Sequence, residues 1–179
     1  MSRPILTLAA MMSFAAAFAC GGGPPPGAAG PEPLAPLSDQ DRLYYDNGEG
    51  ITDSVRIVVR DAAALADVWN RATSRQASPA PAPAVDFASH MVVVTGAGRM
   101  TPEDRIRVDS VGVREVTDAV GDEEDVMLVV VRTTEGCRRF NVDAYPVEIV
   151  RVPRFDGAVR FLERRERDSN CAPGEPPAP

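Results

Sequence analysis

Hydrophobic residues occur in short runs along most of the chain, and these runs have the composition or the alternation of β-strands. β-branched residues dominate residues 126–131, the most apolar run after the N-terminal segment, which we expect to form a central strand. Residues 105–113 begin with charged and apolar side chains in alternation, as in a strand with one buried face. The expected strands are residues 42–45, 55–60, 91–95, 105–113, 126–131, 146–152 and 158–162.

One segment has the period of a helix. Asp61 is a suitable N-cap, because its carboxylate can accept hydrogen bonds from free amides of the first turn. The residues that then share one helical face are Ala62, Leu65, Val68, Trp69 and Ala72. Trp69, the only tryptophan, is expected to anchor this helix on a sheet. The sequence therefore predicts an α+β fold, in which one helix packs on a largely antiparallel sheet of about six to seven strands.

The last two expected strands flank Asp156-Gly157, a strong signal for a two-residue hairpin. A two-residue turn would place Glu148 opposite Arg165, whereas a four-residue turn would place Glu148 opposite Glu163. Like charges directly opposite each other destabilise a strand pair. We therefore expect the two-residue hairpin.

The N-terminus has the pattern of an export signal. Arg3 precedes an apolar run at residues 5–19, which is too short for a typical bilayer span. Small residues Ala17 and Ala19 before Cys20 fit signal-peptidase cleavage. The last four residues of the segment also resemble the lipobox of bacterial lipoproteins, in which the cysteine becomes lipidated. Both signals place the mature N-terminus at Cys20.

Composition divides the rest of the chain. Residues 20–37 and 172–179 are rich in Gly, Pro and Ala and cannot form a core. The predicted organisation is a signal peptide at residues 1–19, a Gly/Pro-rich tether at 20–37, a single domain at 38–171 and a disordered Pro-rich tail at 172–179.

Charge excludes some partners. The 19 basic residues, all Arg, stand against 26 acidic ones, so the formal net charge is -7. An acidic domain is a poor ligand for nucleic acid, and a poor one for anionic lipid. We expect no nucleic-acid partner, and membrane attachment through acylation.

Three cysteines are an odd number for an exported protein. If Cys20 carries a lipid, Cys137 and Cys171 remain to form a disulfide in an oxidising compartment; two free thiols are the alternative. The odd number of cysteines therefore favours lipidation of Cys20. We expect the protein in the bacterial cell envelope, where lipidated Cys20 would anchor it at the periplasmic or outer surface. Without the lipid, the protein would be secreted or periplasmic.

Candidate catalytic groups are few. His90, the only histidine, cannot build a His-rich metal site, although it could pair with Cys137 as a nucleophile. Residues 121–125 lack the spacing of a calcium loop and are expected to form a solvated acidic turn. We expect no catalytic residue, no metal and no cofactor. Arginines crowd the last third and could hold an acidic partner or pair with nearby acids: Arg138, Arg139, Arg151, Arg154, Arg160, Arg164, Arg165 and Arg167.

The order of elements between about residues 55 and 164 resembles the C-terminal domain of PrcB, the stabilising subunit of a bacterial surface protease complex. The residues that carry the resemblance are Leu65, Trp69, residues 83–87, residues 91–98, Thr101, residues 106–108, Leu128 and residues 146–152. The family has a Thr-Gly-Gly-Tyr signature, whereas Thr101 is followed here by Pro102, Glu103 and Asp104. The resemblance implies a non-catalytic envelope domain that contacts or stabilises another protein.

The expected function is that of a non-catalytic envelope lipoprotein that binds or stabilises a partner protein such as a protease. Its expected contact residues are Met100, Thr101, Pro102, Glu103 and Asp104. An envelope enzyme with a carboxylate-based site and a purely structural domain are the alternatives. A cleft that gathers carboxylates of perturbed pKa would favour the enzyme. An exposed apolar patch beside residues 100–104 would favour the binding domain.

Overall fold

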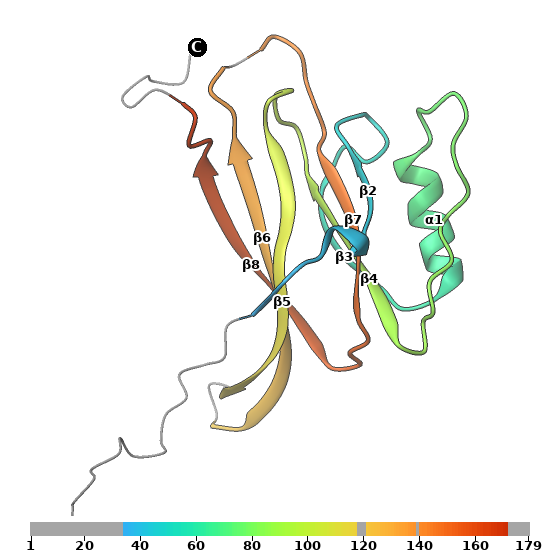
Figure 1. Ribbon diagram of the computed structural model, residues 1–179, viewed down its shortest axis with the longest axis vertical. Helices are drawn as coiled ribbons and strands as arrows, with labels where there is room; N and C mark the ends of the chain where they lie inside the picture. The colour runs from blue at the N-terminus through green and yellow to red at the C-terminus, as the bar shows by residue number, and fades with distance from the viewer. Residues whose placement is uncertain (1–33, 118–120, 139, 172–179) are drawn as a thin grey trace, which may run out of the picture. The chain divides into compact units, whose positions relative to one another are not determined.

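The computed structural model describes residues 34–117, 121–138 and 140–171 (Figure 1). The predicted signal peptide, Cys20 and the Pro-rich tail lie outside the described residues. The elements are β1 (Ala35–Pro36), η1 (Asp39–Asp41), β2 (Arg42–Asp46), β3 (Ser54–Val59), α1 (Ala62–Ala72), β4 (His90–Ala97), β5 (Arg105–Thr117), β6 (Glu123–Glu135), β7 (Val147–Pro153) and β8 (Ala158–Arg167). At eleven residues, α1 is too short to span a bilayer, and no other described helix is longer.

The strands form two sheets, so the predicted single-sheet α+β fold is wrong. The outer sheet has the order β1-β5-β6-β8, and the central sheet has the order β2-β7-β4-β3. The central sheet lies between the outer sheet and α1, so the fold is mostly β with three layers (Figure 1). Hydrophobic patterning found the strands, but it carries no information on which strands share a sheet.

Two cores fill the spaces between these layers. Val92 and Val94 of β4 pack in the cluster that includes Trp69 of α1. Met91 and Val93 of the same strand pack in the cluster that faces the outer sheet. A strand buried on both faces reads as a continuous apolar run, which explains why β4 shows no alternation.

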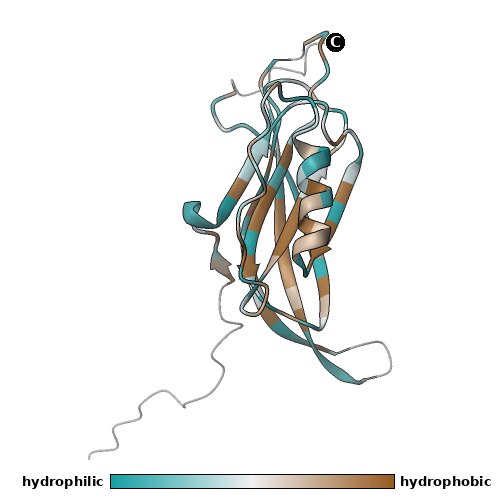
Figure 2. Ribbon diagram, turned by 90° about the vertical axis from the view of Figure 1, so that its right-hand side faces the viewer, coloured by the Kyte–Doolittle hydropathy of each residue, from teal (hydrophilic) through white to brown (hydrophobic). Residues whose placement is uncertain are grey.

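The helix prediction is confirmed. Asp61 caps α1 by accepting a hydrogen bond from the Ala64 amide at 2.8 Å. The buried helix residues are Leu65, Val68, Trp69 and Ala72, whereas Ala62 is exposed. In Figure 2 the helix lies across the apolar strands of the central sheet. The Trp69 indole also donates to the Ala80 carbonyl at 2.8 Å, which holds the following loop against the helix.

The predicted hairpin at Asp156-Gly157 is wrong. β7 pairs on one edge with β2 and on the other with β4, so it has no edge left for β8. The chain instead crosses to the outer sheet, where β8 pairs in parallel with β6. Glu148 lies opposite Tyr45 and Thr95, while Arg165 lies opposite Thr133.

Several elements extend beyond their predicted bounds. The acidic residues 123–125 belong to β6 and pair with residues 115–117 of β5, so the strand pair replaces most of the predicted acidic turn. Ala35 and Pro36, assigned to the tether by composition, pair with Val111 and Ser110 of β5. β5 and β6 have thirteen residues each. Their long pairing can stabilise polar strand ends that the local sequence pattern does not predict.

A row of polar side chains crosses the central sheet on the face toward the outer sheet. Cross-strand pairing places Tyr45, Glu148, Thr95 and Arg56 side by side in this order. Glu148 and Thr95 are fully buried. We call these four residues the polar row. Its position marks where the space between the sheets changes from apolar to polar.

Glu148 connects the polar row to the outer sheet. Its carboxylate accepts from the Val108 amide at 2.5 Å and from Arg107 Nη1 at 2.8 Å, and it also pairs with Arg42. Arg42 Nη2 in turn donates to the Val108 carbonyl at 3.2 Å. The side chains of Glu148 and Arg42 therefore form hydrogen bonds with the backbone N–H and C=O groups of Val108 on β5. Val108 lies next to the short stretch of β5 that pairs with β1.

We predict that Glu148→Gln lowers the free energy of unfolding by about 3 kcal/mol, because it leaves two arginines without their buried counter-charge. Glu166→Gln is the matched control, since Glu166 forms an exposed ion pair with Arg132 at 3.1 Å. It should cost less than about 1 kcal/mol. Urea unfolding followed by Trp69 fluorescence measures both. Equal midpoints for the two variants would contradict the role of Glu148.

Candidate functional site

Two loops meet at one end of the sandwich. Met100 follows β4, and Ala144 precedes β7; their backbones form a bridge with hydrogen bonds of 2.8 and 3.0 Å. The loop between β4 and β5 is thereby joined to the loop between β6 and β7, and both lie at the upper end in Figure 1. Residues 100–104, 136–138 and 140–145 are called the loop edge below.

Asp104 organises the first of these loops. Its side chain is buried and accepts from the Thr101 amide at 2.9 Å, the Thr101 hydroxyl at 3.0 Å and the Gly136 amide at 2.8 Å. Residues 101–104 therefore form a turn in which the side chain of the last residue, Asp104, is hydrogen-bonded to the first residue, Thr101. The same carboxylate fastens this turn to the end of β6.

Glu103 forms hydrogen bonds with the segment that follows β6. It accepts from Arg138 Nε at 2.7 Å and from the Arg138 amide at 3.1 Å. A Cβ on Gly136 would lie 2.2 Å from the Glu103 Cβ, so only glycine allows this approach. The side-chain hydrogen bond from Arg138 is the main cause that lowers the pKa of Glu103 below its usual value.

The predicted Cys137–Cys171 disulfide is confirmed, and it lies at the same end of the molecule. The Cys171 amide donates to the Asp168 carbonyl at 3.0 Å, and Asp168 pairs with Arg105 at 2.5 Å. The bridge therefore connects the segment after β6 to the segment after β8. It also closes one side of a small cavity.

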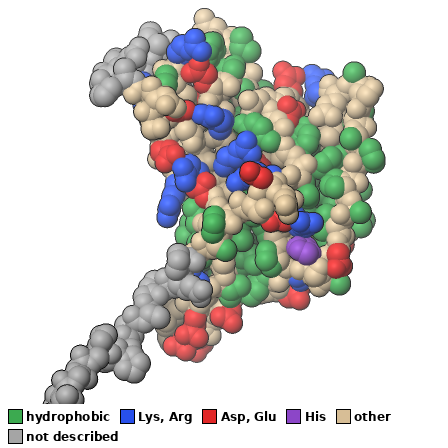
Figure 3. Space-filling view, in the orientation of Figure 1, with side chains coloured by type: hydrophobic (Ala, Val, Ile, Leu, Met, Phe, Trp, Pro, Cys, Tyr) green, Lys and Arg blue, Asp and Glu red, His purple; other side chains and the backbone are tan. Residues whose placement is uncertain are grey.

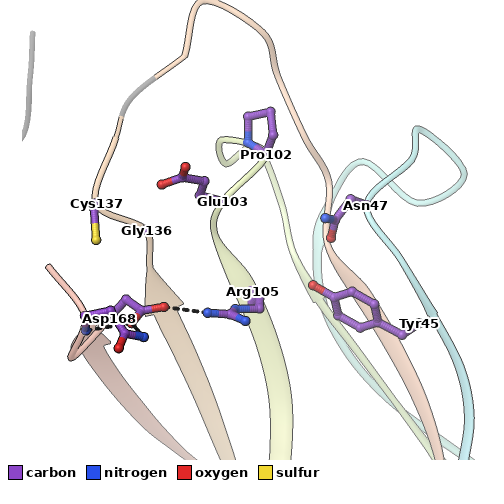
Figure 4. Close-up of a pocket in the computed structure, with 9 residues that line it drawn as sticks. Tyr45, Asn47, Pro102, Glu103, Arg105, Gly136, Cys137 and Asp168 are labelled. Atoms are coloured by element: carbon purple, nitrogen blue, oxygen red, sulfur yellow. Dashed lines mark hydrogen bonds and ion pairs between the residues drawn. The ribbon is translucent and has the colours of Figure 1, made fainter.

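This cavity has a volume of about 310 Å³ (Figure 4). Its lining residues are Tyr45, Asn47, Pro102, Glu103, Arg105, Gly136, Cys137, Asp168 and Asn170. The Tyr45 hydroxyl points toward Asn47, and neither this hydroxyl nor Asn47 Oδ1 has a hydrogen-bond partner among the described residues. Burial raises the pKa of Tyr45, although the Arg107 guanidinium lies 4.2 Å from its ring centroid.

The carboxylates of the cavity are held in the ionised state. Arg138 lowers the pKa of Glu103, and hydrogen bonds led by the Asn170 amide lower the pKa of Asp168. A general acid near neutral pH needs a raised carboxyl pKa. These two carboxylates are therefore better suited to fixing loops, or to binding a cation or a hydrogen-bond donor, than to transferring a proton.

Exposed apolar side chains stand beside this cavity. Four large hydrophobic residues are exposed among the described residues, and two of them, Phe140 (38%) and Val142 (63%), lie on the loop edge. The Arg138 guanidinium lies 5.2 Å from the centroid of the Phe140 ring. Fixed backbone and exposed apolar groups therefore occur together beside residues 100–104, as a binding domain requires.

The other sequence candidates are not brought together. Cys137 is bonded to Cys171, and His90 Nδ1 lies 2.7 Å from the Ser89 hydroxyl, so they form no nucleophilic pair. No group of three metal-ligating side chains occurs within residues 34–117, 121–138 and 140–171. Arginine and acidic side chains are interspersed on the face seen in Figure 3. Arg139 lies outside the described residues.

Sequence reasoning found the loop at residues 100–104 and the two cysteines, but it missed the rest of the site. Arg105 and Asp168 meet only because the start of β5 and the end of β8 lie at the same end of one sheet. Tyr45 lies on β2 of the other sheet, and Asn47 directly follows that strand. Phe140 could have been noticed, because it is an aromatic residue in a polar segment without strand alternation.

No family model, no curated protein and no solved structure matches this chain. The resemblance to the C-terminal domain of PrcB therefore stays a prediction from the residues.

We predict that replacing both Cys137 and Cys171 by serine lowers the free energy of unfolding by about 3–4 kcal/mol, from the chain entropy regained by a loop of 34 residues. Urea unfolding of the variant and of the non-reduced protein measures the difference. Mass spectrometry of a non-reduced digest should show the linked peptides. Two thiols open to alkylation in the untreated protein would contradict the bridge.

We also predict that Glu103 titrates below its ordinary pKa of 4.5, and that Arg138→Gln returns the midpoint toward that value. The folded pKa is lowered, so the stabilising contribution is present above pH 4.5 and is lost as the pH falls through the lowered value. Carboxyl chemical shifts measured by NMR give the midpoint. Arg105→Gln is the control, since Arg105 pairs with Asp168 instead; an unshifted midpoint in Arg138→Gln would refute the assignment.

Proposed function

We propose that this protein is a non-catalytic, exported binding domain that contacts a partner protein through the loop edge. The observation that carries the proposal is the exposure of Phe140 and Val142 on a loop whose backbone is fixed to residues 100–104. Apolar side chains exposed together beside a rigid loop are typical of protein contact sites.

The fixed geometry of the loop edge supports this function. Buried Asp104 and half-buried Glu103 hold both loops through charge-assisted hydrogen bonds, and the disulfide adds a covalent tie. A loop that is already ordered loses little conformational entropy on binding. Aromatic and arginine residues dominate the energetics of many interfaces, and Phe140 and Arg138 stand side by side here.

The location and the class of partner come from the sequence. The predicted signal, the Gly/Pro-rich tether and Cys20 support a location in the cell envelope as a lipoprotein, and a disulfide agrees with an oxidising compartment. The resemblance to the C-terminal domain of PrcB suggests a partner that this domain stabilises, such as a protease. No described feature favours the alternative enzyme, because the cavity carboxylates are ion-paired and stay ionised.

The test is site-specific photocrosslinking of the full-length protein in its own cells. A photoreactive residue replaces Val142 in one variant and Leu162, which is also exposed (43%) but lies on β8, in a control. We expect one discrete adduct from position 142 that is absent from position 162. Adding Phe140→Asp should lower the yield about tenfold, as removal of an interface anchor does.

Two results would contradict the proposal. One is the same set of adducts from positions 142 and 162, which would indicate non-specific collisions. The other is the absence of any adduct from position 142 in cells that contain correctly folded protein, as judged by the intact Cys137–Cys171 bridge.

A further inference from the structure

The edge of β5 that faces away from β6 is covered along only part of its length. β1 pairs there with Ser110 and Val111. Leu34 then lies over Gly112, where its Cδ2 would be 2.8 Å from an added Cβ. Beyond this point no described strand pairs with this edge, because β6 occupies the other one. Residues 113–117 are therefore the end of a long strand with one free edge.

The register shows which backbone groups lie at this free edge. The Leu37 amide donates to the Asp109 carbonyl at 2.8 Å, and residues at two-residue intervals turn their backbone groups to the same side of a strand. Val113 and Glu115 therefore present their N–H and C=O groups at the free edge. The Val113 carbonyl accepts from Arg114 Nη1 at 2.8 Å, so a side chain bonds it where a neighbouring strand would.

The end of the hairpin that β5 forms with β6 carries carboxylates on one face. Cross-strand pairing places Glu115 opposite Asp125 and Thr117 opposite Glu123. These three carboxylates form no ion pair with a described residue. Like charges directly opposite each other destabilise a strand pair, so the fold does not benefit from this arrangement. Val113, which is 40% exposed, lies on the same face two residues before Glu115.

This end of the hairpin is open to solvent. In Figure 2 the ends of β5 and β6 project beyond the neighbouring strands as a polar ribbon, and in Figure 3 acidic side chains gather at the lower end of the molecule. On the opposite face of the hairpin, Glu124 lies 3.6 Å from Arg160, which partly neutralises that face. The unpaired negative charge is therefore concentrated on the face that carries Val113 and Glu115.

We propose that residues 113–117 form a docking edge for a basic, extended segment of another protein. The segment adds to β5 as a further strand and forms backbone hydrogen bonds with Val113 and Glu115. Its side chains on the acidic face are arginine or lysine, because these neutralise Glu115 and Asp125. In Figure 1 this edge lies at the opposite end of the sandwich from the loop edge, so it is separate from the contact site proposed above.

The experiment titrates the mature protein with a short peptide of alternating arginine and threonine, and with the same peptide carrying glutamate in place of arginine. NMR shifts give the affinity, and amide hydrogen exchange reports the addition of a strand. We expect only the arginine peptide to bind and to slow the exchange of the Val113 and Glu115 amides. The Arg114 amide should change little, because it faces β6.

Two substitutions test the charge complementarity. Glu115→Gln and Asp125→Asn should each weaken binding of the arginine peptide about threefold, the loss expected for one exposed ion pair. Asp67→Asn is the matched control, because Asp67 is an exposed carboxylate on α1, away from the hairpin. It should leave the affinity unchanged.

The outcomes separate a docking edge from a general charge effect. Failure of the arginine peptide to bind would mean that the carboxylates only keep the edge unpaired, and it would overturn the proposal. Equal weakening in Asp67→Asn, equal binding of both peptides, or binding without slower exchange at Val113 and Glu115 would overturn it as well. Phe140→Asp should leave the affinity unchanged, which keeps this test apart from that of the loop edge.

Discussion

The structure depends on one buried carboxylate that joins the two sheets. Glu148 has no exposed surface, and ionised groups are strongly disfavoured in such positions unless every lone pair is satisfied. Here Arg42, Arg107 and the Val108 amide satisfy it, and each of them belongs to a strand other than β7. The interaction therefore fixes the approach of β2, β5 and β7 at once. It also marks where the space between the sheets becomes polar.

The second constraint is the number of edges that a strand has. β7 is bounded by β2 and β4, so the chain must leave the central sheet at Asp156-Gly157 and enter the outer sheet as β8. This crossing brings the end of β8 beside the end of β6, which places Cys171 at Cys137. It also places Arg165 across the open side of the sandwich from Arg56. A local hairpin would have produced neither arrangement.

The loop edge combines apolar contact groups with a rigid backbone. The loop edge offers apolar groups on a backbone fixed by Asp104, Glu103 and the disulfide, a combination suited to a protein surface.

Features that depend on near neighbours in the chain could be predicted from the sequence. The N-cap at Asp61, the buried stripe of α1 and the approximate positions of seven strands follow from local periodicity, and the pairing of Cys137 with Cys171 follows from cysteine number. The division of the strands between two sheets, the burial of Glu148 and the meeting of the loops could not be predicted, because they depend on tertiary contacts. Periodicity reports how many faces of a strand are buried, but not which strand occupies each edge. That choice is made by contacts between residues far apart in the chain, such as those that Val108 and Glu148 make here.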